Sequence, residues 1–139
     1  MMKKVLLAIT LLGFMTACSQ SDDKTQMTLD QQVDQLVTEA KFDEAMELLD
    51  ETSSEEALKL REDVHLRHGI YLIYNADPSQ MRENANNALR EFIAVLELNP
   101  DNEKARAEIE QILGIYRTFP DRQPAEDVLD QLRDFGFQI

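Results

Sequence analysis

Apolar residues recur at helical spacing from residue 28 to residue 139, and this periodicity limits the possible folds more than any other feature of the chain. Residues three and four positions apart lie on the same face of an α-helix, and an apolar face must be buried against a partner. No segment shows the alternation of apolar and polar residues that is typical of a half-buried strand. The sequence therefore predicts an all-α domain over residues 28–139.

About six helices joined by short turns are expected in this domain, and they favour three antiparallel pairs. The helix over residues 53–75 has a second apolar stripe of Leu66, Ile70 and Ile73, so we expect it to be buried on two sides. The main predicted faces are, in chain order, Leu29, Val33, Leu36, Val37 and Ala40; Phe42, Ala45, Met46, Leu48 and Leu49; Ala57, Leu60, Val64, His68 and Tyr71; Met81, Ala85, Ala88, Phe92 and Val95; Ala105, Ile109, Ile112 and Tyr116; and Val128, Leu129 and Leu132.

Capping signals stand at the expected starts of the first and third helices. Thr28 and Gln31 occupy the two positions of a capping box, and so do Ser53 and Glu56. At the other end of the chain, Gly136 follows the last short helix, of about residues 125–135, where glycine commonly ends a helix.

Two prolines mark the ends of the fourth helix. Asp77 before Pro78 predicts its start, because aspartate caps a helix and proline fits the first helical position. Asn99 before Pro100 predicts its end, because the residue before a proline is pushed out of the α region. Asp101 is then expected to cap the fifth helix.

Residues 1–17 have the three parts of a signal peptide. Lys3 and Lys4 form a positive start, Val5 to Met15 are apolar apart from Thr10, and small residues follow. This apolar run of about eleven residues is shorter than the roughly twenty that a transmembrane helix needs. A buried first helix of the domain is a poor alternative, because no charged residue interrupts the run and every face of the helix would have to be buried.

Met15 to Cys18 resembles the bacterial lipobox, in which an apolar residue and two small residues precede a cysteine. This resemblance implies cleavage between Ala17 and Cys18 and attachment of lipid, including palmitate, to the Cys18 sulfur. Residues 18–27 are then a lipidated flexible tether, and Ser19 resembles an address to the outer membrane, facing the periplasm, with surface exposure left open. The alternative is an unmodified thiol beside a signal sequence.

The charge of the chain excludes some partners. It has 14 lysine and arginine residues against 27 acidic residues, which gives a net charge of −13. Loss of the signal peptide removes Lys3 and Lys4 and makes the charge −15. Such a surface repels phosphate, so nucleic-acid binding is not expected. A basic protein partner and simple solubility both remain compatible with it.

The segment from Ala88 to Ala105 resembles the second helix and exit turn of a tetratricopeptide repeat (TPR). Ala88, Phe92 and Pro100 fit the pattern, while Val95 stands where alanine is usual. The resemblance implies that the small residue lets helices approach, that the aromatic residue fills the gap between repeats, and that the proline ends the helix.

Residues 40–49 resemble the turn inside such a repeat, with Phe42 and Ala45 at the aromatic and small positions. The first helices of the pairs match poorly, and helix 53–75 is longer than a 34-residue repeat permits.

A TPR-like right-handed superhelical array is the fold that the resemblance implies, and an irregular helical bundle is the alternative. In that array the first helix of each pair lines a partner-binding groove, whose candidate residues are Gln32, Asp63, Arg67, Arg106 and Glu110.

The chain offers few groups for catalysis or metal binding. His65 and His68 are the only histidines, and with Glu62 they follow each other three residues apart on one side of a helix. Histidines that share a zinc ion are more typically four apart, and the single cysteine is assigned to lipid. We therefore predict no metal site, no cofactor other than the covalent lipid, and no enzymatic activity.

The predicted function is that of an envelope lipoprotein whose helical domain is an adaptor or assembly factor for a partner protein. Two alternatives stay open. One is a carrier of a small ligand or a metal that uses the His65 and His68 helix and the Tyr71–Tyr74 region. The other is a structural envelope lipoprotein without a dedicated partner.

Overall fold

The computed structural model describes residues 27–119 and 121–139, which form six α-helices and no strand. The all-α prediction is therefore confirmed. The predicted signal peptide, its cleavage site and the tether up to residue 26 lie outside the described residues. The elements are α1 (Leu29–Thr38), α2 (Phe42–Asp50), α3 (Glu55–Tyr74), the 3-10 helix η1 (Pro78–Gln80), α4 (Met81–Leu98), α5 (Glu103–Arg117) and α6 (Glu126–Asp134).

One predicted capping box is present and the other is wrong. The Thr28 hydroxyl accepts a hydrogen bond from the Gln31 backbone N–H at 3.3 Å, and the Gln31 side chain accepts one from the Thr28 N–H at 3.0 Å. The third helix begins at Glu55, and its cap lies one residue after the expected Ser53. Its cap is Ser54, whose hydroxyl accepts from the Ala57 N–H at 3.0 Å, so Ser53 and Glu56 do not form a box.

The two prolines lie just outside the ends of α4, with Pro78 before its start and Pro100 after its end. Asp77 caps η1 by accepting from the Ser79 N–H at 2.9 Å, and α4 continues from η1 until Leu98. The predicted cap at Asp101 is wrong, because α5 begins only at Glu103 and the Asn102 side chain accepts from the Ala105 N–H at 2.8 Å. Gly136, with φ of +84°, follows α6 in the left-handed conformation that favours glycine.

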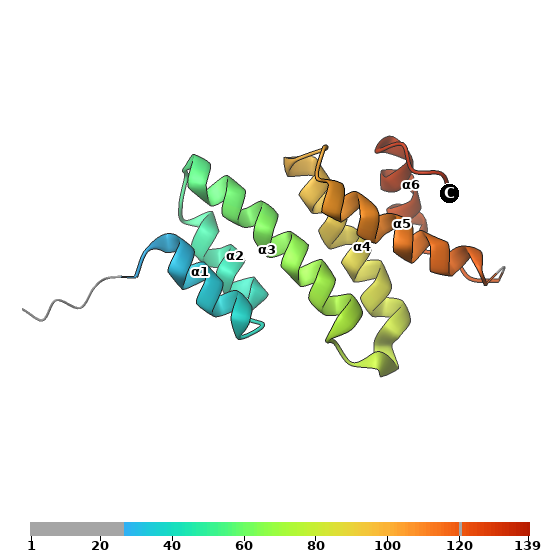
Figure 1. The fold of residues 1–139 in the computed structure, drawn as a ribbon, viewed down its shortest axis with the longest axis horizontal. Helices are drawn as coiled ribbons and strands as arrows, with labels where there is room; N and C mark the ends of the chain where they lie inside the picture. Colours follow the sequence, from blue (N-terminus) through green and yellow to red (C-terminus); the bar gives the residue numbers. More distant parts are fainter. Residues whose placement is uncertain (1–26, 120) are drawn as a thin grey trace, which may run out of the picture.

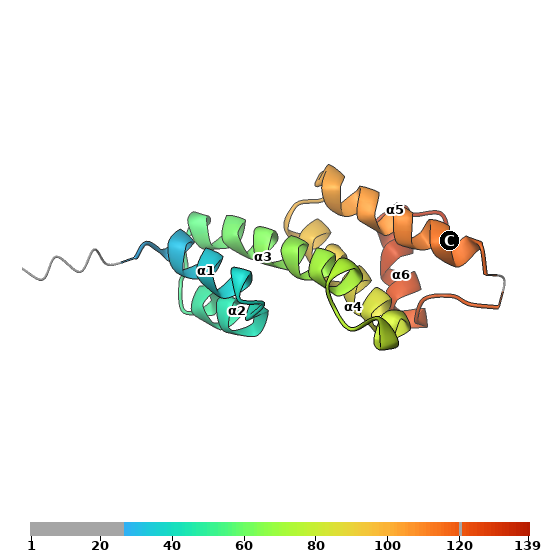
Figure 2. The same ribbon diagram turned by 60° about the horizontal axis from the view of Figure 1, so that its bottom comes forward.

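Helix α3 connects two hydrophobic clusters, as its two apolar stripes predict. The stripe that includes Ala57 and Val64 packs into a cluster with α1 and α2. The stripe of Leu66, Ile70 and Ile73 packs against a larger cluster built from α4, α5 and α6. Figures 1 and 2 show α3 running from the α1 and α2 end of the molecule to the α4 end.

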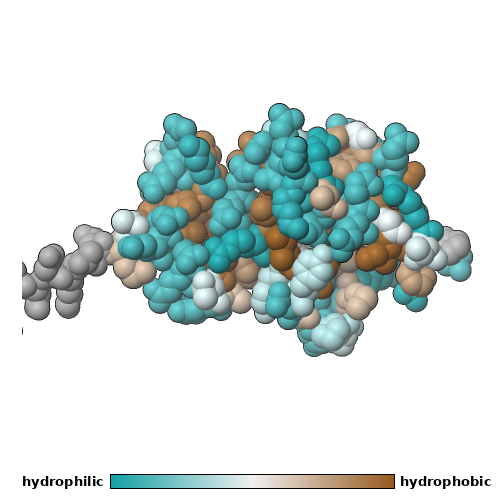
Figure 3. Space-filling model, viewed as in Figure 1, coloured by the Kyte–Doolittle hydropathy of each residue, from teal (hydrophilic) through white to brown (hydrophobic). Residues whose placement is uncertain are grey.

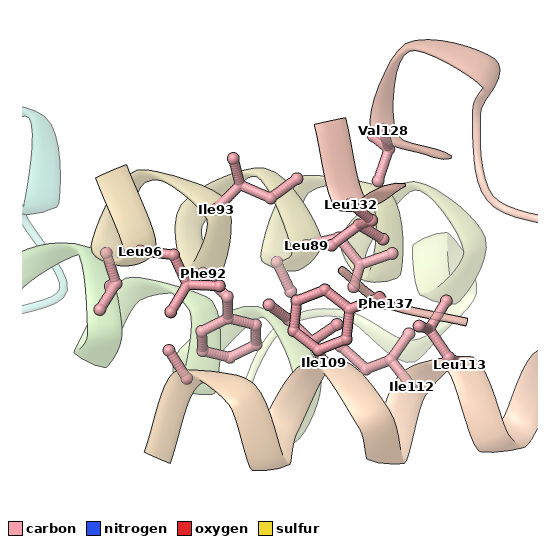
Figure 4. Packing of buried hydrophobic residues seen from close by; sticks show 13 residues of the cluster. Leu89, Phe92, Ile93, Leu96, Ile109, Ile112, Leu113, Val128, Leu132 and Phe137 are labelled. Atoms are coloured by element: carbon pink, nitrogen blue, oxygen red, sulfur yellow. The ribbon is translucent and has the colours of Figure 1, made fainter. Parts of the chain in front are cut away.

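Helices α3 and α4 pack closely at Gly69. A Cβ atom on Gly69 would lie 2.6 Å from Cε1 of Phe92, so only glycine fits against the ring. Phe92 is itself fully buried, with Ile93 and Leu96 beside it in the larger cluster (Figure 4). Nothing in the sequence marks Gly69 as a packing position, because a glycine within a helical pattern carries no sign of its neighbour in another helix.

The last helix, α6, makes its main helix contact with α4 rather than with α5, the helix that precedes it. Arg90 of α4 reaches across to Asp127 of α6, with 2.9 Å between Nη2 and Oδ2. The arrangement into three antiparallel pairs and the right-handed superhelical array stay predictions.

Candidate binding groove

An apolar groove lies between the C-terminal end of α3, the N-terminal end of α4 and the C-terminal end of α5, and its volume is about 650 Å³. We call it the α3–α5 groove. Its apolar lining is formed by Leu72, Ile73, Tyr74, Ala76, Pro78, Met81, Ala85, Ile112, Ile115, Tyr116 and Phe119. A cavity of several hundred Å³ with a mainly apolar lining is typical of a binding site.

Large apolar side chains reach solvent at this groove. Met81 is 69% exposed, Tyr74 55% and Ile115 53%, and Phe119 is also exposed. On the face of the molecule in Figure 3, apolar patches interrupt a mainly hydrophilic surface. The prediction that Met81 lies on the buried face of its helix is therefore wrong, because Met81 begins α4 where the groove leaves the helix uncovered.

Hydrogen bonds hold the walls of the groove in place. The Tyr74 hydroxyl donates to Glu108 Oε2 at 3.1 Å, and Gln111 Nε2 donates to the Tyr74 oxygen at 2.8 Å, so the end of α3 is fixed to α5. Asn84 is buried and donates to the Asp77 carbonyl at 2.9 Å, which fixes the turn before α4. The groove is thus formed before any ligand arrives.

Tyr116 places an unpartnered polar group in this apolar setting. Its hydroxyl oxygen is buried and has no hydrogen-bond partner among the described residues. Burial raises the pKa of Tyr116, while the nearby positive charge of Arg82 acts in the opposite direction. The hydroxyl is therefore protonated at neutral pH and can donate a hydrogen bond to a ligand.

The predicted groove residues lie elsewhere, in two separate places. Arg67 pairs with Asp34 at 2.8 Å and with Asp63 at 3.5 Å, beside a smaller hollow of about 160 Å³ between α1 and α3. Gln32 of α1 donates to the Met27 carbonyl at 2.9 Å. None of these residues lines the α3–α5 groove.

The other two predicted residues lie on α5. The Arg106 side chain donates to the carbonyls of Pro100 and Phe135 and lies over the Phe137 ring, 5.4 Å from its centroid. Glu110 is 3.5 Å from Arg117. The structure therefore does not gather the five predicted residues into one groove, and their role in partner binding stays a prediction.

The predicted packing residues are mostly buried. Phe42, Ala45, Ala88 and Phe92 belong to the two hydrophobic clusters, whereas Pro100 is exposed in the turn between α4 and α5. Ala40, which the periodicity placed on the α1 face, lies instead in the turn after it with φ of +58°. This is the left-handed conformation in which glycine is usual.

The two histidines contact one carboxylate on α4. His65 Nδ1 lies 2.7 Å from Glu91 Oε2, and His68 Nδ1 lies 3.1 Å from Glu91 Oε1. The His68 ring also stacks on Phe42, with 4.4 Å between the ring centroids. Burial raises the pKa of Glu91, but the hydrogen bonds from His65 and His68 outweigh it and hold this pKa at about 2.

These contacts give the histidines a structural role between α3 and α4. Within residues 27–119 and 121–139, no group of three or more His, Cys, Asp or Glu side chains could hold a metal ion. In the same part of the chain, none of the helices combines the length and apolar composition needed to cross a membrane.

No protein family, curated protein or solved structure matches this chain.

Sequence reasoning missed most of the groove. Ile115 lies off the stripe that buries α5, and Phe119 and Arg122 follow the helix in the connection to α6. An apolar residue off the buried stripe, close to a helix end, is the signal that could have indicated an uncovered face. It could not have shown that three helix ends meet there.

Proposed function

We propose that this protein is a membrane-anchored bacterial envelope lipoprotein, held by lipid on Cys18, whose TPR-like helical domain binds a segment of a partner protein. The α3–α5 groove carries this proposal. Its apolar lining is open to solvent, and burying exposed apolar side chains under a partner is favourable by roughly 25 cal/mol per Å². The proposed location is the outer membrane, on the side that faces the periplasm.

Site-specific photocrosslinking in intact cells tests this function. A photoreactive phenylalanine analogue at Ile115 places the label in the groove, on a side chain that is 53% exposed. Leu58 of α3 is 54% exposed and lies outside the groove, so it is a matched control position. We expect a specific protein to be captured from position 115 and not from position 58.

A second variant checks that the capture depends on the groove. Met81→Asp places a charge on the groove lining at a largely exposed position, so the fold should tolerate it. We expect this change to reduce the capture from position 115. Identical products from both labelled positions, or no product from position 115, would contradict the proposed function.

A carrier of a small apolar ligand is the second candidate function. Tyr74, which the carrier hypothesis included, lines the α3–α5 groove, whereas the ring nitrogens Nδ1 of His65 and His68 face Glu91. The carrier therefore depends on the groove and not on the histidines. Mass spectrometry of small molecules that stay with the purified protein distinguishes it from the adaptor.

A further inference from the structure

Two arginines at the α3–α5 groove lack the carboxylate partners that most other basic side chains have in the described part of the chain. Neither the Arg82 nor the Arg122 guanidinium forms an ion pair or a hydrogen bond with any described residue, and both residues line the groove. Arg122 lies over the Phe119 ring, 5.3 Å from its centroid, and Arg82 lies close enough to influence Tyr116. The basic residues that do pair with carboxylates in this part of the chain are Lys41, Lys59, Arg61, Arg67, Arg90, Lys104, Arg117 and Arg133.

The composition makes this lack of partners informative. The chain has 27 acidic residues against 14 basic ones, so a surface arginine meets a carboxylate easily. Two unpaired arginines at one apolar groove therefore form a local positive region on a strongly acidic protein. An uncharged occupant would take water from both guanidinium groups without giving them a partner, and such desolvation is costly.

We propose that the α3–α5 groove binds a partner segment in which large apolar side chains stand next to aspartate or glutamate. This inference rests on the proposed function and specifies the chemistry of the partner. The apolar side chains fill the lining, a carboxylate pairs with Arg82 and Arg122, and the Tyr116 hydroxyl donates to an oxygen of the segment. The groove thus selects an acidic ligand although the protein as a whole repels one.

The openness of the groove favours a peptide over an acyl chain. Met81, Tyr74 and Ile115 are all more than half exposed, so a bound acyl chain would keep one side in water. A peptide segment covers these side chains with its own apolar residues and turns its polar backbone to solvent. A second copy of this chain is disfavoured, because its net charge of −13 would repel the first.

Selection from a randomised peptide library tests the proposal. The full chain is held in nanodiscs of zwitterionic phosphatidylcholine, and peptides that also bind the Met81→Asp variant are discarded. We expect the remaining peptides to combine Asp or Glu with large apolar residues. A general surface of this acidic protein would instead select basic peptides.

Matched variants then test the two arginines with one selected peptide. Because a hydrogen bond to a charged group contributes about 1.5–3 kcal/mol, Arg82→Gln with Arg122→Gln should weaken binding by roughly tenfold or more. Lys59→Gln with Arg133→Gln changes the net charge equally at exposed positions outside the groove and should leave binding unchanged. Circular dichroism confirms that both double variants are folded.

Several results would overturn the inference. Selected peptides without an excess of acidic residues, or equal affinities for the two double variants, would leave the arginines without a role. A fatty acid that stays with the purified protein, or self-association that Met81→Asp abolishes, would assign the groove to another occupant. If no peptide binds in a groove-dependent way and position 115 captures nothing in cells, the proposed function fails as well.

Discussion

The contact between Gly69 of α3 and the Phe92 ring of α4 depends on the absence of a single methyl group. A Cβ atom at position 69 would lie 2.6 Å from Phe92 Cε1, and Phe92 is fully buried and cannot move away freely. Overpacking a core costs about 1–3 kcal/mol, whereas alanine in a helix recovers up to about 1 kcal/mol relative to glycine. We expect Gly69→Ala to lower the free energy of unfolding by about 1–2 kcal/mol in urea titrations.

Gly114 is the matched control for this prediction. It lies within α5, and a Cβ atom there would meet nothing within 4 Å. Gly114→Ala should therefore raise the free energy of unfolding by up to about 1 kcal/mol through helix propensity alone. If both alanine variants changed the free energy of unfolding in the same direction, the close packing against Phe92 would not determine the effect at position 69.

The ionisation of Glu91 links stability to pH. The pKa of Glu91 is about 2 in the folded protein, below its usual 4.5. A lowered folded pKa stabilises the protein above pH 4.5, and this contribution is lost as the pH falls from 4.5 towards 2. The loss should reach up to about 3 kcal/mol in the native protein and be largely absent in Glu91→Gln.

Urea titrations at a series of pH values between neutral and acid measure this effect. Glu97→Gln is the control, because Glu97 is an exposed residue of the same helix without an ion pair among the described residues. The stability that Glu97→Gln loses between neutral and acid pH should match the loss in the native protein. An unchanged acid loss in Glu91→Gln would mean that the contacts with His65 and His68 do not stabilise the carboxylate.

At the scale of the elements, the start of α3 depends on one of two adjacent serines. Ser54 accepts a hydrogen bond from the Ala57 N–H at 3.0 Å, whereas Ser53 is exposed outside the helix. Ser54→Ala should lower the free energy of unfolding by about 1 kcal/mol, the typical value of an N-cap. Ser53→Ala should have little effect on the free energy of unfolding. If Ser53→Ala were instead the more destabilising variant, Ser53 would be the cap of α3, as the sequence suggested.

Periodicity predicted the helices well because each helix buries one stripe along its length. For α3 it also predicted two buried sides, which the two hydrophobic clusters confirm. It was wrong at Met81 and Ala40, both of which continue a stripe beyond the point where another element covers it. A stripe shows which residues can be buried, while the position of the neighbouring helices decides how far the burial extends.

At the scale of the whole molecule, the proposed lipid anchor is tested at Cys18. In cells that take up labelled palmitate, we expect the native protein to carry the label and to sediment with membranes. Cys18→Ser removes the only thiol, so the label should be lost. Serine tests the sulfur itself, because it keeps the size and polarity of the site.

Retention of the leader gives an independent measurement. Intact mass should show that the native protein begins at Cys18, while Cys18→Ser should keep residues 1–17. An unlabelled native protein that begins at Met1 would remove both the proposed anchor and the proposed location. It would leave the α3–α5 groove itself untouched.

The sequence by itself determined the helical class, some of the helix ends and which stripes are apolar, because these follow from contacts between residues a few positions apart. Only the tertiary structure decided that Gly69 lies against Phe92, that one carboxylate contacts both histidines, and that Arg82 and Arg122 share an apolar groove. Those residues are distant in the sequence, and no local pattern records the packing of helices that brings them together.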